Sequence, residues 1–233
     1  MAKCEVLVEA APEDDITSLV RHFDELAAAA PHMRMDAATC RRFLVARKGD
    51  IAAAERSLAD FATWREAAKP REIKREDVAK ELSTRKGYVH GVDRANRPVV
   101  WVFASRHDKS ERDLEESVKL VLFLMEQAIE QADRRGEEKL CLVFDCSSFA
   151  YRNMDFDLER RLIQILEQYY PERMAHLVSW RAPSLFYIFW RIVRPWLDPV
   201  TASKVELVDD DRLAELVDRE QLPDEVAARL YGA

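Results

Sequence analysis

Isolated charges and a dense apolar run alternate between Tyr169 and Val208. Glu172 and Arg173 come first, within the sequence Tyr-Pro-Glu-Arg, and Lys204 comes at the end, where a strand is expected. Cationic side chains donate hydrogen bonds to a phosphodiester, whereas a carboxylate accepts them from hydroxyl groups. An apolar element flanked by such charges is typical of a site for a ligand with a long apolar body and a polar head.

The apolar run itself predicts a helix from Pro183 to Leu197. At 100° per residue, its polar side chains Tyr187, Arg191 and Arg194 fall within about 60° of the circumference, and nearly all other positions are apolar. A helix packed on one side of a domain needs only about a third of its surface to be apolar. We therefore expect one face to pack on a sheet and another to face a cavity, a partner or a bilayer. The alternative is a core helix buried on all sides.

The elements before this region predict an all-helical N-terminal lobe over residues 1–85. Residues 1–14 are interpreted as a loose acidic leader. Asp36 is a plausible N-cap for the second helix, and prolines at 31 and 70 end the first and third. The expected helices are Ile16–Ala29, a second one from Asp36 that carries TCRRFLVARK, Ile51–Lys69 and Arg75–Leu82.

Strands and helices then alternate over residues 86–233, which predicts an α/β lobe with a mixed, largely parallel sheet. The expected strands are Val99–Phe103, Leu140–Phe144, His176–Trp180 and Lys204–Val208. The expected helices are Leu114–Arg134, Asp157–Tyr170, Pro183–Leu197 and a short one from Asp210, before a turn at Leu222-Pro223.

Composition narrows the class of protein. The 233 residues are 48% hydrophobic, as in ordinary globular proteins, and the net charge of −7 argues against nucleic acid as a partner and against broad attraction to anionic membranes. Cys4, Cys40, Cys141 and Cys146 lack the spacing of a metal site and are expected to be reduced thiols. No targeting segment is evident, and the longest run without charge has nine residues. We expect a cytoplasmic monomer without metal or cofactor.

Three segments resemble the Sec14-like (CRAL-TRIO) lipid-binding family. Residues 41–66, RRFLVARKGDIAAAERSLADFATWRE, are similar to its N-terminal helical motif. Residues 91–102, GVDRANRPVVWV, resemble the start of its lipid-binding domain, although Asn96 replaces the more usual glycine. Residues 169–208 are the most similar of the three.

This resemblance implies a single lipid in a hydrophobic pocket that is floored by the sheet and closed by a mobile gate helix, here Pro183–Leu197. Hinges are expected near Pro183 and near Asp198-Pro199. The residues expected to contact acyl chains are Phe186, Phe189, Trp190, Val193 and Trp196. The residues expected to bind the head group are Arg47, Lys48, Glu172, Arg173 and Lys204. This set favours phosphatidylinositol, while the alternative for each charge is an ordinary surface ion pair.

One strand departs from the family pattern. Relatives that bind phosphatidylcholine carry a pair of small hydroxyl residues there, whereas this chain has Leu140 and Leu142 before Asp145. Leucine cannot hydrogen-bond a choline head group. We therefore expect phosphatidylinositol alone, or its exchange with a more apolar counter-ligand.

Three other functions are alternatives to lipid transfer. A hydrolase with a Cys146–histidine pair is disfavoured, because the sequence lacks GxSxG, HExxH, P-loop and GxGxxG motifs. Relatives of this fold also hold tocopherol, retinoid, sterol-like or haem ligands, which remain alternatives. Presentation of the lipid to a lipid kinase is a further one. The expected protein is not an enzyme but a lipid carrier that contacts membrane surfaces transiently.

Overall fold

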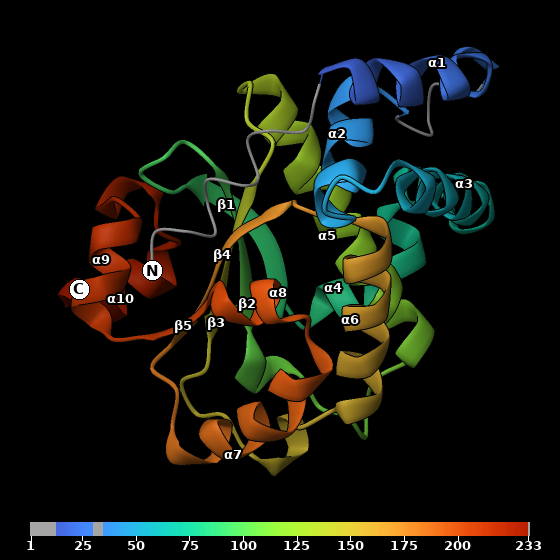
Figure 1. Cartoon of the computed structure of the whole chain (residues 1–233). Coiled ribbons are helices and arrows are strands. Elements are labelled where there is room, and N and C mark those ends of the chain that lie inside the picture. The colour runs from blue at the N-terminus through green and yellow to red at the C-terminus, as the bar shows by residue number, and fades with distance from the viewer. Residues whose placement is uncertain (1–12, 30–34, 233) are drawn as a thin grey trace. The chain divides into compact units, whose positions relative to one another are not determined.

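The computed structural model describes residues 13–29 and 35–232, which belong to two compact units (Figure 1). One unit contains residues 1–71 and 166–172, and the other contains residues 72–165 and 173–233. The boundary between lobes at residue 85 stays a prediction. Pro31, Cys4 and most of the expected leader lie outside the described residues. Glu13 and Asp14, assigned to the leader, are helical instead, because acidic residues stabilise a helix N-terminus.

The first unit is built from three helices, α1 (Glu13–Ala29), α2 (Ala37–Ala46) and α3 (Ile51–Ala68). Asp36 caps α2 as predicted, and its carboxylate accepts a hydrogen bond from the Thr39 backbone N–H at 2.7 Å. Asp50 caps α3 in the same way, at 2.9 Å from the Ala53 N–H. Each cap satisfies one of the backbone donors that a helix leaves unpaired at its start.

Apolar side chains from all three helices form the core of this unit. Trp64 of α3 stacks on Tyr169, with ring centroids 4.3 Å apart and an interplanar angle of 7°. The buried members are Ile16, Leu19, Phe23, Met35, Cys40, Phe43, Leu44, Ala54, Leu58, Phe61 and Ala62. The Tyr169–Glu172 corner thus belongs to the helical unit, although it is distant in sequence.

The second unit contains a five-stranded sheet in the order β1-β2-β3-β4-β5. Its strands are β1 (Gly87–Val92), β2 (Pro98–Phe103), β3 (Leu140–Asp145), β4 (Met174–Trp180) and β5 (Val205–Val208). Strands β1 and β2 are antiparallel, and the other pairs are parallel, which confirms the predicted mixed sheet. Strand β1 was not predicted, because glycines at 87 and 91 weaken its strand pattern.

Helices precede, connect and follow these strands. They are α4 (Ala79–Ser83), α5 (Leu114–Arg134), α6 (Phe156–Tyr169, whose last turn belongs to the first unit), α7 (Ser184–Val193), α8 (Pro199–Ser203), α9 (Asp210–Leu216) and α10 (Asp224–Tyr231). Single 3₁₀ turns are η2 (Pro70–Glu72), η3 (Arg75–Val78), η4 (Ala104–Arg106), η5 (Tyr151–Asn153), η6 (Arg194–Trp196) and η7 (Arg219–Gln221).

Two helical predictions need correction. The segment Pro183–Leu197 is not one helix, because α7 ends at Val193 and η6, which contains Pro195, follows it. Helices α8 and α10 were also missed. Each is short and starts next to a proline, at Pro199 and Pro223, which looks like a turn signal in sequence.

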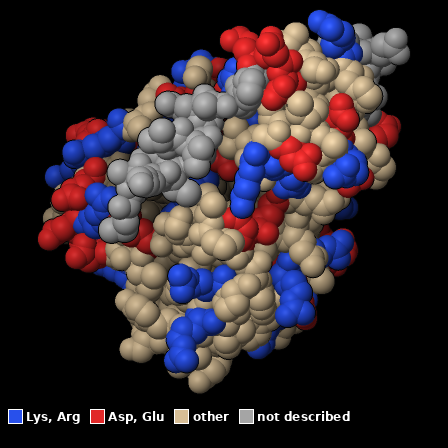
Figure 2. Space-filling view, in the orientation of Figure 1, with Lys and Arg blue, Asp and Glu red and all other residues tan. Residues whose placement is uncertain are grey.

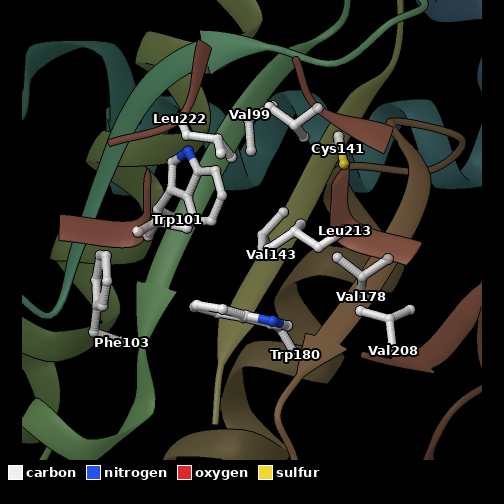
Figure 3. Close-up of a cluster of buried hydrophobic side chains, with 12 residues drawn as sticks. Val99, Trp101, Phe103, Cys141, Val143, Val178, Trp180, Val208, Leu213 and Leu222 are labelled. Atoms are coloured by element: carbon white, nitrogen blue, oxygen red, sulfur yellow. The ribbon is translucent and has the colours of Figure 1, made fainter. Parts of the chain in front are cut away.

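One face of the sheet is sealed by α9, α10 and the segment between them. In Figure 1 these helices lie together at the left of the sheet, whereas α7 lies below it. Figure 3 shows side chains from alternate positions of β2, β3 and β4 meeting Leu213 and Leu222. The buried members of this sealed cluster are Val99, Trp101, Phe103, Cys141, Val143, Val178, Trp180, Val208, Leu213, Val217, Leu222 and Val226.

Candidate ligand-binding site

The opposite face of the sheet is apolar but incompletely covered. Val102, Phe144, Leu177 and Leu207 alternate with the residues of the sealed cluster, so they point to the other side. Phe144 lies opposite Val102 on β2 in the strand register. All four side chains are only partly buried, although the residues on either side of Val102 in β2 and of Phe144 in β3 are almost fully buried. Part of this face therefore stays uncovered.

Helix α7 packs against this face through a second cluster, here called the gate cluster. Its buried members are Cys146, Phe149, Met154, Phe186, Phe189 and Val193, with Phe144, Phe156, Ile163, Leu185, Trp190, Trp196 and Leu207 among those partly buried against it. Phe189 lies 5.4 Å from both Phe149 and Phe156 between ring centroids. All five residues predicted to contact acyl chains belong to the gate cluster, namely Phe186, Phe189, Trp190, Val193 and Trp196.

The outer face of α7 is exposed and carries apolar side chains. Tyr187, Ile188 and Ile192 are 50%, 53% and 44% exposed, and Arg191 and Arg194 are exposed beside them. Figure 2 shows mainly uncharged and basic surface around α7, at the bottom of the view. The prediction of two apolar faces is thus confirmed, and the alternative of a helix buried on all sides is wrong.

The N-terminal end of α7 is tied to the sheet by Arg181. Its guanidinium donates to Asp210 at 2.7 and 2.5 Å and lies over the Trp180 ring at 4.6 Å. Arg181 has a left-handed backbone with φ of 52°, which is unfavourable for a residue other than glycine. Two residues later Pro183 is the N-cap residue of α7, at the position predicted as a hinge.

A buried polar network holds the segment that leads into α6. Asp155 accepts hydrogen bonds from Arg112 at 2.5 and 3.0 Å and from His107 Nε2 at 3.1 Å. Lys86 lies 3.2 Å from the other ring nitrogen, Nδ1. Despite burial, which raises it, the pKa of Asp155 is lowered by these donors, Arg112 first. Met154 and Phe156, on either side of Asp155, pack in the gate cluster. The network that holds Asp155 therefore also holds these two residues in place.

Three residues of the predicted head-group set belong to the first unit. Arg47 is the C-cap of α2, and its Nε donates to Ser57 Oγ at 2.8 Å. Lys48 follows, exposed and with a left-handed backbone, and Glu172 is partly buried with φ of 58°. Cations at a helix C-terminus are stabilised by its partial negative charge.

The other two residues belong to the second unit. Arg173 is buried and donates to the Glu138 carbonyl at 2.9 Å, with Asp133 at 4.0 Å. Lys204 is partly buried where α8 meets β5, and its carbonyl accepts from Leu177 N–H at 3.1 Å. Because the five residues are divided between the units, their assembly into one head-group site stays a prediction.

Two polar residues of the gate side were missed. Ser179 of β4 lies opposite Phe144 and Leu207 in the strand register, and Glu159 of α6 lies between Phe156 and Ile163 at helical spacing. A serine within the run His176–Trp180 and an acid on an apolar helix face were the available signals. Neither signal indicates a site until the strand register and the helix direction are known.

Cysteine chemistry is disfavoured. Burial is the main cause that raises the pKa of the Cys146 thiol, and the Asp145 charge adds to it, so thiolate is scarce near neutral pH. Burial likewise raises the pKa of Cys141 to about 12. Among the described residues there is no histidine, cysteine and carboxylate grouping suited to a metal ion.

No helix within residues 13–29 and 35–232 is long and apolar enough to cross a membrane.

Comparisons with known proteins agree with this architecture. Phosphatidylinositol transfer protein CSR1 of Eremothecium gossypii is 31% identical over 205 residues, 81% of this chain and 46% of that protein. CRAL-TRIO domain-containing protein C3H8.02 of Schizosaccharomyces pombe is 32% identical over 73% of this chain and 40% of its own length. The chain thus spans less than half of either relative. The SEC14 cytosolic factor of Candida glabrata is 29% identical over 89% of this chain and 74% of its own.

A solved structure shows the same fold. The crystal structure of Sfh5 superposes with a TM-score of 0.68 over 88% of this chain and 84% of that one, at 17% identity. The family model described as the CRAL/TRIO domain matches residues 82–226, and this range includes all five strands of the sheet. By this match and its relatives, the chain belongs to the Sec14-like CRAL/TRIO domain family.

Proposed function

We propose that this chain binds a single phospholipid, phosphatidylinositol, between the uncovered sheet face and α7, and transfers or presents it between membranes. The observation that carries the proposal is the partly uncovered apolar face of β2–β5 beneath an aromatic helix. The names of two relatives, phosphatidylinositol transfer proteins CSR1 and PDR17, support the same ligand. The protein acts as a carrier without a chemical step and without a cofactor.

The benefit of such a carrier follows from the hydrophobic effect. Moving one acyl chain of about 14 carbons into water costs roughly 11 kcal/mol at ~0.8 kcal/mol per CH₂. An apolar surface that receives the chain as it leaves the bilayer removes much of this barrier. Phe144, Leu177 and Leu207 provide such surface on the sheet, and Phe186 and Phe189 provide it on α7.

Recognition of the head group is assigned to Arg47, Lys48, Glu172, Arg173 and Lys204. In this proposal Arg47, Lys48 and Lys204 bind the phosphodiester, and Glu172 accepts hydrogen bonds from the inositol hydroxyls. Arg173, which donates to the Glu138 carbonyl, is the fifth residue of this set.

Membrane contact is assigned to the outer face of α7. Ile188 and Ile192 enter the interface, and Arg191 and Arg194 contact anionic head groups. This local surface differs from the chain as a whole, which is acidic. Opening of α7 then turns on the segments at Arg181–Pro183 and Asp198–Pro199.

Native mass spectrometry after incubation with mixed phospholipid vesicles tests the ligand. We expect a bound mass that corresponds to phosphatidylinositol, and its loss in Lys204→Ala and in Arg47→Ala. Lys119→Ala, on the exposed side of α5, is the matched control and should keep the lipid. A bound lipid that persists in both variants would contradict the head-group assignment.

Transfer between vesicles tests the gate. Phe189→Asp with Trp190→Asp should abolish transfer, since charge replaces the inner apolar contact. Ile188→Asp with Ile192→Asp should slow transfer at least ten-fold, yet leave lipid already bound in place. Unchanged transfer in both double variants would exclude α7 as the gate.

A further inference from the structure

The segment between β4 and α7 consists of Arg181, Ala182 and Pro183, and most of its backbone is restricted. Pro183, the N-cap residue of α7, has a φ of −75° that its ring fixes. Ala182 precedes a proline and is therefore biased towards extended conformations. Arg181 is the remaining residue, and its φ of 52° is in the left-handed region, which is unfavourable for a residue other than glycine. A change in the direction of α7 at this end therefore falls mainly on the backbone of Arg181.

Arg181 is held in this conformation by contacts with other elements. Its guanidinium donates to both carboxylate oxygens of Asp210, at the start of α9, at 2.7 and 2.5 Å. The same group donates to the Arg229 carbonyl of α10 at 3.1 Å, and the Arg181 backbone N–H donates to the Val208 carbonyl of β5 at 3.2 Å. A bidentate pair fixes direction as well as distance. Three separate elements, α9, α10 and β5, thus hold the residue that sets the direction of α7.

Trp180 provides a rigid base for these contacts. Its side chain is fully buried in the sealed cluster (Figure 3), and its indole N–H donates to Asp210 at 2.8 Å. The guanidinium groups of Arg181 and Arg229 lie 4.6 and 4.8 Å from the centroid of the Trp180 ring, where a cation is attracted to the indole. Arg229 also donates to the buried Asp145. The contacts of Arg181 are therefore built on the sealed core.

The Arg181–Asp210 pair is accessible enough to break and re-form. The two side chains are 33% and 43% exposed, so water and dissolved ions reach the pair and weaken it. The hydrogen bond from Arg181 is the main cause that lowers the pKa of Asp210, against the effect of burial. The pair therefore stays charged near neutral pH. Such a contact holds a conformation and is still readily reversed.

We propose that the Arg181–Asp210 pair is a latch that keeps α7 closed, so that α9 and α10 control a gate on the opposite face of the sheet. This inference rests on the proposed function of α7 as a gate. While the pair is intact, it holds Arg181 in the unfavourable left-handed conformation. When the pair breaks, the backbone of Arg181 returns to a commoner conformation, and this change redirects Pro183 and the start of α7.

Release of a fluorescent lipid tests the latch. The full chain is loaded with pyrene-labelled phosphatidylinositol, and loss of this lipid to excess phosphatidylcholine vesicles is followed with time. Arg181→Ala removes the pair and keeps the unfavourable backbone, so we expect roughly five-fold faster release, as for the loss of a partly exposed ion pair. Arg181→Gly also removes the pair but suits the left-handed conformation, so its release should be slower than that of Arg181→Ala.

Two further variants are the controls. Arg85→Gly replaces another exposed arginine with a left-handed backbone, φ of 53°, in the turn before β1, and it should leave release unchanged. Asp210→Asn should speed release, yet its combination with Arg181→Ala should be no faster than Arg181→Ala alone, because both substitutions remove one interaction. Equal release from Arg181→Ala and Arg181→Gly, or additive effects in the double variant, would overturn the latch.

Hydrogen exchange tests the same latch without lipid. In the lipid-free protein, Arg181→Ala should speed exchange of the α7 amides relative to Arg85→Gly. Exchange at Val143 and Val178, in the sealed cluster, should stay unchanged and so shows that the variant is folded. If none of the chains binds lipid, the proposed function fails, while exchange in α7 still decides for or against the latch. Exchange in α7 that is unchanged by Arg181→Ala would overturn the latch, whether or not lipid binds.

Discussion

The two faces of the sheet differ in how completely their side chains are buried. The sealed face contains fully buried side chains, namely Trp101, Val143, Val178, Trp180 and Leu213. On the gate face, Phe144, Leu177 and Leu207 are only partly buried, and the helix over them exposes apolar residues to solvent. The sealed face is packed as a complete hydrophobic core. The gate face has apolar surface that the rest of the chain covers only in part.

Polar groups differ between the two faces as well. Asp145, at the end of β3, is buried and accepts a hydrogen bond from Arg229 Nη2 at 2.5 Å, and the Trp180 indole donates to Asp210 at 2.8 Å. On the gate side, the buried Ser179 Oγ has no hydrogen-bond partner among the described residues, and burial raises the pKa of Glu159 to about 7. Buried polar groups are normally paired, so the gate side lacks the polar pairing that the sealed face has.

The largest contrast is expected from leucine truncation on each face. Leu213→Ala removes a fully buried side chain of the sealed cluster and should lower the free energy of unfolding by about 3–5 kcal/mol. Leu207→Ala, on the partly covered gate face, should cost only about 1 kcal/mol. Urea unfolding of the lipid-free protein measures both. Equal losses would mean that the gate face is packed as tightly as the sealed one.

The two carboxylates should respond in opposite directions. Asp145→Asn removes the charge that pairs with Arg229 and should destabilise the protein by about 3 kcal/mol. Glu159→Gln should instead stabilise it near pH 8, by up to about 3 kcal/mol, since a difference of one in pKa corresponds to roughly 1.4 kcal/mol.

The direction for Glu159 follows from its protonation. Burial and the Asp155 charge raise its pKa in the folded state to about 7, above the ordinary 4.5. The folded state thus holds the proton more tightly, and stability is lost as pH rises from about 4.5 through 7. Near pH 4.5 the Glu159→Gln variant and the unmodified chain should therefore differ little. A variant that is no more stable than the unmodified chain at about pH 8 would show that Glu159 is well solvated.

Lipid removal should affect one face only. Bound lipid at about 100 times its Kd adds roughly 2.7 kcal/mol of stability. By hydrogen exchange, we expect delipidation to speed exchange in α7 and at the end of β4, whereas α9 and Val143 of β3 should change little. Uniform acceleration over both faces would contradict a ligand that is confined to the gate side.

The sequence predicted most elements of this comparison, because their signals are local. Helix α5 occurs at its predicted bounds, Leu114–Arg134, since its apolar residues repeat at helical spacing. The gate segment was located from its unusual density of aromatic residues. Strand β1 and helix α10 were not predicted from the sequence. Glycine and proline dominate their local signals, and tertiary packing determines their structure.

The candidate site was less accessible to prediction than the fold. Which face of α7 is buried depends on its direction over the sheet, and the helical wheel alone left Ile188 and Phe189 equivalent. The structure separates them, with Ile188 53% and Phe189 6% exposed. Ser179 and Glu159 are placed on the gate side only by the strand register and by the position of α6, and no sequence spacing indicates this.

The smallest expected effect concerns the network behind the gate cluster. Lys86 lies 3.2 Å from His107 Nδ1, so that nitrogen accepts a hydrogen bond, while Nε2–H donates to Asp155. Burial, and then the Lys86 charge, lower the pKa of His107 below its ordinary 6.5, against the opposing charges of Asp155 and Glu81. The unfolded chain therefore takes up this proton first, and stability should be lost as pH falls below 6.5.

Comparison of His107→Gln with His90→Gln, at an exposed histidine, tests this effect. Between about pH 7.5 and about pH 5.5, the unmodified chain and the His90 variant should lose stability in parallel, whereas the His107 variant should lose less. Urea unfolding at each pH measures the difference. If all three chains lose stability equally, His107 does not couple protonation to the support of Met154 and Phe156, and the gate face is held by its apolar contacts alone.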